Sequence, residues 1–208
     1  MTYVKTESGA VVRYPYDLSN LRAENPHTMF PKVPSAESLA QVGVFAVTPT
    51  TKPDANSEQI VVEGEPVKVG QVWKQSWTIR NKTAQELADA KAARRTEVNA
   101  LKVAKQSGQA PTSQGAVDCD TDSRNKLNGA VLMAMLALQN SQPFALSWTM
   151  ADNTQVSLDA IGAIALGQEV GGYIAAVHGH AITLKTAIDA ATSFAELAAI
   201  DIDAGWPS

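Results

Sequence analysis

The chain of 208 residues is poor in several features, and each absence narrows what the protein can be. It has one cysteine, Cys119, so an internal disulfide framework is excluded and nothing points to secretion through an oxidising compartment. Its net charge of −4 argues against a nucleic-acid or anionic-membrane binder. No apolar run reaches the ~18 residues that a membrane span needs, and residues 1–10 have no apolar signal core. We therefore expect a protein made and folded in a cytoplasm, with no nucleic-acid or membrane partner.

The common motifs of catalysis and metal binding are also missing. The chain contains no G-x-S-x-G, no phosphate-binding glycine loop and no H-E-x-x-H. His178 and His180 stand two apart in a helical stretch, so their side chains diverge by about 200° and cannot share a metal. Cys119 has no histidine close by in sequence, which favours buried packing over a nucleophile. We predict a non-enzyme with no catalytic, cofactor-binding or metal-binding residue.

One acidic cluster stands out, "DCDTD" at residues 118–122, directly before an apolar segment. Its alternating aspartates suggest a calcium loop. An EF-hand loop would need glycine at its sixth position and glutamate at its twelfth, where this chain has Ser123 and Gly129. We interpret the cluster as a strand-to-helix corner in which Thr121 or Asp122 accepts the first free N–H groups of the helix.

The first 82 residues are rich in β-branched and aromatic residues and punctuated by proline, which predicts short strands and turns. A turn is expected at Ser8-Gly9, and the strand "VWKQSWTIR" places both of its tryptophans on one face. The aromatic residues exceed what a minimal core needs, so some of them are expected to be exposed anchors for another protein. The candidate interface residues are Tyr14, Tyr16, Phe30, Trp73 and Trp77.

A long helix is predicted to follow. Thr83-Ala-Gln-Glu86 is a capping box, in which each of the two side chains binds a free backbone N–H at the helix start. The helix can continue to about Gln106, and its thin apolar face includes Leu87 and Val98. A helix this polar is typical of a link between two bodies. A coiled-coil seam is the less favoured alternative, because the heptad positions are poorly filled.

The rest of the chain, residues 108–208, is expected to be a second small domain that folds on its own. Residues 107–115 are polar and predict a flexible turn, while a hairpin is expected around 151–153. Apolar residues spaced by three and four predict helices before and after this hairpin, and Gly171-Gly172 predicts a bend or a close helix crossing. The predicted fold class is α+β, with a strand-rich domain at 1–82, a linking helix at 83–107 and a helix-rich α+β domain at 108–208.

Several stretches, "YPYDLSNLRAENPHTMFP", "VWKQSWTIRNKTAQE", "WTMADNTQVSLDA" and "AIDAATSFAELAAIDIDAGWP", together resemble bacteriophage tail-fibre assembly or tail proteins that carry a C-terminal domain of unknown function. The resemblance implies a structural or adaptor protein of the virion tail, made in the host cytoplasm. Its expected partners are tail-fibre or baseplate proteins and further copies of itself, as a homo-oligomer within the tail. Two alternatives stay open. One is a chaperone that assists fibre folding or trimerisation, and the other is a carbohydrate-binding module that contacts host glycan through Trp73 and Trp77.

Overall fold

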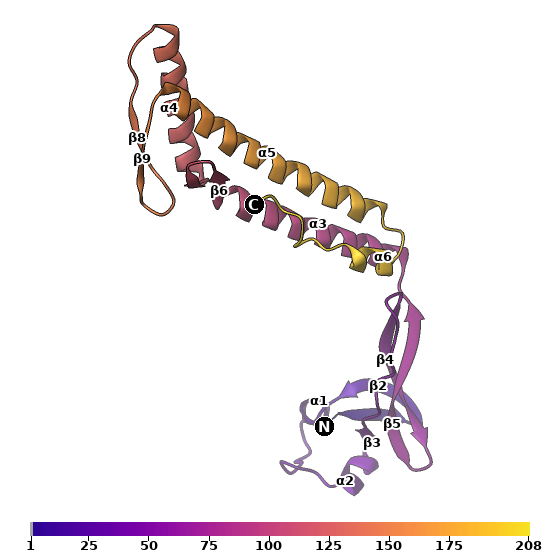
Figure 1. The fold of residues 1–208 in the computed structure, drawn as a ribbon. Helices are drawn as coiled ribbons and strands as arrows, with labels where there is room; N and C mark the ends of the chain where they lie inside the picture. The colour runs from indigo at the N-terminus through magenta and orange to yellow at the C-terminus, as the bar shows by residue number, and fades with distance from the viewer. Residues whose placement is uncertain (1) are drawn as a thin grey trace. The chain divides into compact units, whose positions relative to one another are not determined.

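The structure, a computed structural model, describes residues 2–208, and Met1 of the predicted first domain lies outside them. The chain divides into two compact units, Met1–Lys82 (unit 1) and Thr83–Ser208 (unit 2). Both units contain helices and strands (Figure 1). The predicted α+β class is therefore confirmed.

Unit 1 is built on a five-stranded sheet with the strand order β2-β1-β3-β5-β4. Neighbouring strands pair antiparallel, except that β3 and β5 pair parallel. The elements of unit 1 are β1 (Tyr3–Glu7), β2 (Ala10–Tyr16), α1 (Leu18–Glu24), α2 (Ala36–Gln41), β3 (Val44–Thr48), β4 (Gln59–Val69) and β5 (Val72–Asn81).

The turn predicted at Ser8-Gly9 is present in unit 1, and a side-chain cap starts its first helix. Ser8 and Gly9 form the turn between β1 and β2 with positive φ angles of 51° and 85°. Asp17 caps α1 by accepting a hydrogen bond from the N–H of Asn20 (2.8 Å). The outer strands of the sheet, β2 and β4, also approach each other. Tyr14 on β2 donates a hydrogen bond to Glu63 on β4.

Unit 2 is organised around its longest helix, α5, which packs against both α3 and α4 (Figure 1). Two antiparallel hairpins, β6–β7 and β8–β9, precede and follow α4. The elements of unit 2 are α3 (Ala84–Gln106), β6 (Gln109–Thr112), β7 (Gly115–Asp118), α4 (Thr121–Gln139), β8 (Leu146–Thr149), β9 (Gln155–Leu158), α5 (Ala160–Ala190) and α6 (Phe194–Ala199).

Helix α3 begins at the predicted capping box and ends at the predicted Gln106. The N–H of Glu86 donates to the hydroxyl of Thr83 (3.2 Å), and the N–H of Thr83 donates to the carboxylate of Glu86 (2.7 Å). Two of the backbone donors that a helix start leaves free are satisfied in this way.

The prediction of a separate linking helix at 83–107 is wrong, because α3 is part of unit 2. Val98 is fully buried (0% exposed), and Leu87 and Leu101 pack beside the same cluster. The apolar stripe of α3 is thin, but it meets the apolar face of α5, which supplies most of the contact. The buried neighbours in this cluster are Ala181, Leu184, Ile188, Ala191, Leu197 and Ile202.

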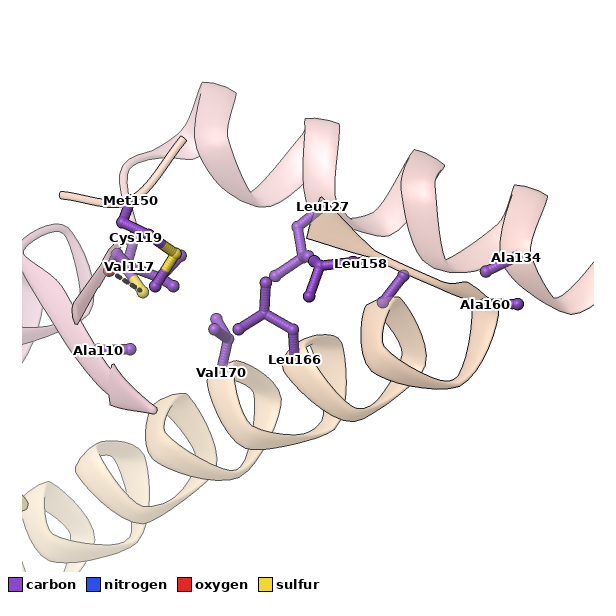
Figure 2. Close-up of a cluster of buried hydrophobic side chains, with 11 residues drawn as sticks. Ala110, Val117, Cys119, Leu127, Ala134, Met150, Leu158, Ala160, Leu166 and Val170 are labelled. Atoms are coloured by element: carbon purple, nitrogen blue, oxygen red, sulfur yellow. Dashed lines mark hydrogen bonds between the residues drawn. The ribbon is translucent and has the colours of Figure 1, made fainter. Parts of the chain in front are cut away.

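Residues 107–115 are not a flexible turn as predicted, because most of them form the β6–β7 hairpin. Ala110 and Val117 face each other across this hairpin, and both are buried. Together with Cys119 they close one end of a core formed mainly by α4 and α5 (Figure 2). Cys119 is fully buried, as its sequence context predicts, and this burial raises the pKa of its thiol.

Helix α5 is continuous from Ala160 to Ala190, so Gly171-Gly172 makes no break in it. The close helix approach lies one turn earlier. A Cβ at Gly167 would stand 2.5 Å from Cγ2 of Val131 on α4, whereas a Cβ at Gly171 or Gly172 would meet nothing within 4 Å. Glycine is therefore needed at Gly167 for α4 and α5 to pack at this distance.

Among residues 2–208, α5 is the one helix that is long and apolar enough to cross a membrane by length and composition. The sequence predicts no apolar run of this length, whereas α5 passes this test although it contains a few polar residues. A mostly buried core helix of a soluble protein passes the same test, whereas 28% of the most apolar window of α5 is buried. The buried residues of α5 pack on α3 and α4 in unit 2.

Candidate protein-interaction site

The acidic corner before α4 is a helix cap. Asp120 accepts hydrogen bonds from the N–H groups of Asp122 (2.8 Å) and Ser123 (3.1 Å), and the Ser123 hydroxyl donates to it (2.6 Å). The bonds from Ser123 are the main cause of the lowered pKa of Asp120. The corner is of the predicted kind, but its cap is Asp120 and neither Thr121 nor Asp122. Within the described part of the chain, no three His, Cys, Asp or Glu residues are grouped to hold a metal.

Calcium is therefore expected to leave the stability of the protein unchanged. A specific site would raise the melting midpoint by mass action, because the ion would bind only the folded state. Melting curves followed by circular dichroism in excess calcium chloride and in EDTA should coincide. Magnesium chloride at the same ionic strength is the control for general salt effects. A rise of several degrees with calcium alone would contradict the capping interpretation.

Two of the five predicted interface residues are buried and cannot anchor a partner. Tyr16 is 1% exposed and Trp73 is 6% exposed. Tyr16 packs in one apolar cluster of unit 1 with Leu21 and Val44, and its hydroxyl donates to Glu24 (2.7 Å). Trp73 belongs to a second cluster of the sheet. Tyr16 and Trp73 are therefore not among the exposed anchors, because both side chains fill the core.

The other three predicted residues, Tyr14, Phe30 and Trp77, are half-buried. The hydroxyl of Tyr14 is held by Glu63, and burial together with that hydrogen bond raises the pKa of Tyr14 to about 12. The indole of Trp77 donates to the hydroxyl of Thr50 (3.1 Å). Because Trp73 is buried, the two tryptophans of β5 do not form an exposed aromatic pair.

The exposed large apolar side chains of unit 2 are concentrated instead on the second half of α4. We name this set the α4 apolar surface. Its members are Leu132 (59% exposed), Met133 (59%), Met135 (55%), Leu136 (42%) and Leu138 (49%). The buried positions of the same helix are Leu127 and Ala134. Figure 1 shows that the last turns of α4 extend beyond the start of α5, which leaves them without a helix packed against them.

A groove lies beside the α4 apolar surface, between α4 and strand β8. Its volume is about 700 Å³. We name it the α4–β8 groove. Gly129, Ala130 and Met133 form much of its helix side. Its hairpin side consists mainly of Phe144, Leu146, Trp148 and Met150. The indole N–H of Trp148 is buried without a hydrogen-bond partner in the structure.

This part of unit 2 is also uncharged. From Leu127 to Ala151 the sequence has no Asp, Glu, Lys, Arg or His. The charged residues that line the groove, Asp118 and Lys126, belong to its end near the start of α4. The arrangement therefore offers apolar contact to another surface.

The sequence of α4 contains a signal for this site that the predictions from the sequence did not include. Residues 131–138, "VLMAMLAL", are apolar at every position, whereas a helix with one buried face needs apolar residues only at spacings of three and four. The apolar side chains of such a helix are removed from water only if other elements cover it on all sides. Unit 2 covers only one side of this segment.

The fold and the site define a two-unit α+β protein whose second unit carries an uncharged apolar surface. A family model described as "Domain of unknown function (DUF4376)" matches residues 89–204, which is more than half of the chain, so the chain belongs to this family. The match takes in most of α3 and all later elements of unit 2, so it contains the whole candidate site. No curated protein and no solved structure matches the chain.

Proposed function

We propose that the protein is a non-enzymatic adaptor or structural component of a bacteriophage tail, where it binds tail-fibre or baseplate proteins. The observation that carries the proposal is the α4 apolar surface, since contiguous exposed apolar patches mark protein interaction sites. The resemblance of "YPYDLSNLRAENPHTMFP" and the other stretches to tail proteins supplies the biological context.

The chemistry of the surface supports contact with a protein. Methionine and aromatic residues are enriched at the centres of protein interfaces, and charged residues are depleted there. Met133 and Met135 stand on the helix, while Phe144 and Trp148 line the neighbouring groove. The site therefore has the composition of an interface centre.

A dissociating fibre chaperone is the second candidate, and the two methionines favour it. Methionine is unbranched and adapts to irregular partners, which suits repeated binding of incompletely folded chains. A glycan-binding module has less support, because Trp73 is buried and leaves Trp77 without a neighbour for sugar stacking.

The location of the protein separates these candidates. Antibodies against unit 2 are expected to detect the chain in purified, nuclease-treated particles of the phage that encodes it, at a fixed ratio to the fibre. A host cytoplasmic enzyme is the control for carry-over. A chain that binds the fibre in the lysate but is lost from finished particles would support the chaperone. A chain found neither in particles nor with any fibre or baseplate protein would contradict the tail proposal.

A further inference from the structure

We infer that the α4 apolar surface is covered by a second copy of this chain, so that the protein forms a two-fold dimer through α4. The inference deepens the proposed function, on which it rests, by assigning this surface to self-association within the tail, so that tail-fibre or baseplate proteins contact the assembled dimer. Three properties of the surface carry it: its area, its lack of charge and its shape.

The area matches what a dimer needs. Five large apolar side chains, each exposed by about half, present several hundred Å² of apolar surface. The largest patch on a typical monomer is ~300–600 Å². The α4–β8 groove lies beside these side chains and adds the exposed parts of its own apolar lining. Surface and groove together form the apolar centre of an interface of standard size, in which each partner contributes ~800 Å² including a polar rim.

The absence of charge makes the surface complementary to itself. A two-fold contact places the same patch of both copies face to face, so a charged residue near the axis meets its own copy and is repelled. No such residue occurs between Leu127 and Ala151. The charged residue of α4 nearest to this stretch is Lys126, and it is already paired with Asp122 (2.6 Å).

The shape is complementary as well. Leu132 and Leu136 are four residues apart and form a ridge along α4, while Gly129 and Met133 form the neighbouring row on the groove side. A Cβ at Gly129 would meet nothing within 4 Å, so the groove side of the helix is low at Gly129 itself. In a two-fold arrangement the leucine ridge of each copy can enter the groove of the other.

The test is the oligomeric state of the purified full chain by sedimentation velocity. The wild-type protein is expected to be a dimer at about 100 μM. The double variant Leu132→Glu/Leu136→Glu should dimerise at least 100-fold more weakly, because dimerisation would bury four unpaired carboxylates, two from each copy. Ile182→Glu on α5 is the matched control, since Ile182 is 52% exposed and should leave the dimer intact.

A second variant guards against a folding defect in the first. Gly129→Glu introduces a charge at the edge of the groove without an internal clash, and glutamate favours a helix over glycine. It should also separate the copies while its melting midpoint stays at or above that of a wild-type sample diluted to monomer. Unchanged dimerisation of both the double variant and Gly129→Glu would overturn the inference.

Disulfide trapping gives an independent readout, because the natural Cys119 is buried and no other cysteine exists. Mild oxidation should cross-link the double variant Gly129→Cys/Leu136→Cys into a dimer, because the leucine ridge of each copy enters the groove of the other, and should leave Ile182→Cys monomeric. A wild-type monomer at about 100 μM, or trapping through position 182 in place of positions 129 and 136, would overturn the inference. A monomer that still joins the virion would leave the proposed function standing, whereas a dimer absent from the tail would contradict only that function.

Discussion

Replacing Val98 by aspartate is expected to unfold unit 2 well below its normal melting temperature while unit 1 melts as before. Val98 lies on α3, is 0% exposed and packs against residues of the α5–α6 region. A carboxylate there would be buried without a partner, which costs about 3–5 kcal/mol. This is a large share of the ~5–15 kcal/mol that stabilises a domain, and it corresponds to a fall of roughly 10 °C or more.

The control lies on the same helix. Val103 is 56% exposed, so Val103→Asp makes the same chemical change in solvent and should alter stability by no more than about 0.5 kcal/mol. Calorimetry of both full-length variants can follow the two units as separate transitions. Equal effects of the two substitutions would mean that α3 is a solvated linker and does not belong to the core of unit 2.

The second large effect is expected from two glycine substitutions on α5 that change the stability of the protein in opposite directions. Gly171→Ala should stabilise the protein by about 0.5–1 kcal/mol, because alanine favours a helix and the new Cβ meets nothing within 4 Å. Gly167→Ala should destabilise it by about 1–3 kcal/mol, because the new Cβ would stand 2.5 Å from Val131 of α4. Urea denaturation of both variants measures the difference.

The cause of the second effect can be isolated with a double substitution. Val131→Ala removes the methyl group that the new Cβ would strike, so Gly167→Ala should cost much less in that background. The unfolding slope should stay the same in all four proteins of the cycle. If Gly167→Ala is as stable as Gly171→Ala in the natural background, the helices do not approach as closely at Gly167 as described.

Local features of the fold were predictable from the sequence because their causes are local. The Thr83–Glu86 box uses side chains within three residues of the donors they satisfy. The Ser8-Gly9 turn needs positive φ, which glycine permits. The residue that caps α4 is Asp120, one residue before the predicted Thr121. Several adjacent residues there are of types that can cap a helix, so the sequence does not single out one of them.

Features that depend on distant residues were not predictable in the same way. A lone apolar residue such as Val98 does not show where its partner lies, and the partner face belongs to α5. The hairpin at residues 109–118 has short polar strands, whose pairing is stabilised by the burial of Ala110 and Val117 in unit 2. Both misinterpretations have the same cause, which is that tertiary packing overrides weak local preference.

The candidate site shows the same division between local and distant information. Large aromatic side chains in unit 1 suggested an interface, but burial in the sheet is the more favourable fate of Tyr16 and Trp73 because each removes a large area from water. On α4, exposed residues such as Leu132 and Met135 look like core residues in sequence. Only the position of α5 shows which side of α4 is covered.

The packing of α3 also sets an order for folding during synthesis. All the strands that pair in the sheet of unit 1 lie within residues 3–81, so that sheet can form as soon as these residues emerge. Val98 packs with residues as distant as Ile202, so the cluster around α3 stays open while the intervening chain is made. At about 5–20 residues per second this takes on the order of ten seconds. During that interval α3 and the apolar segment of α4 are available to folding factors.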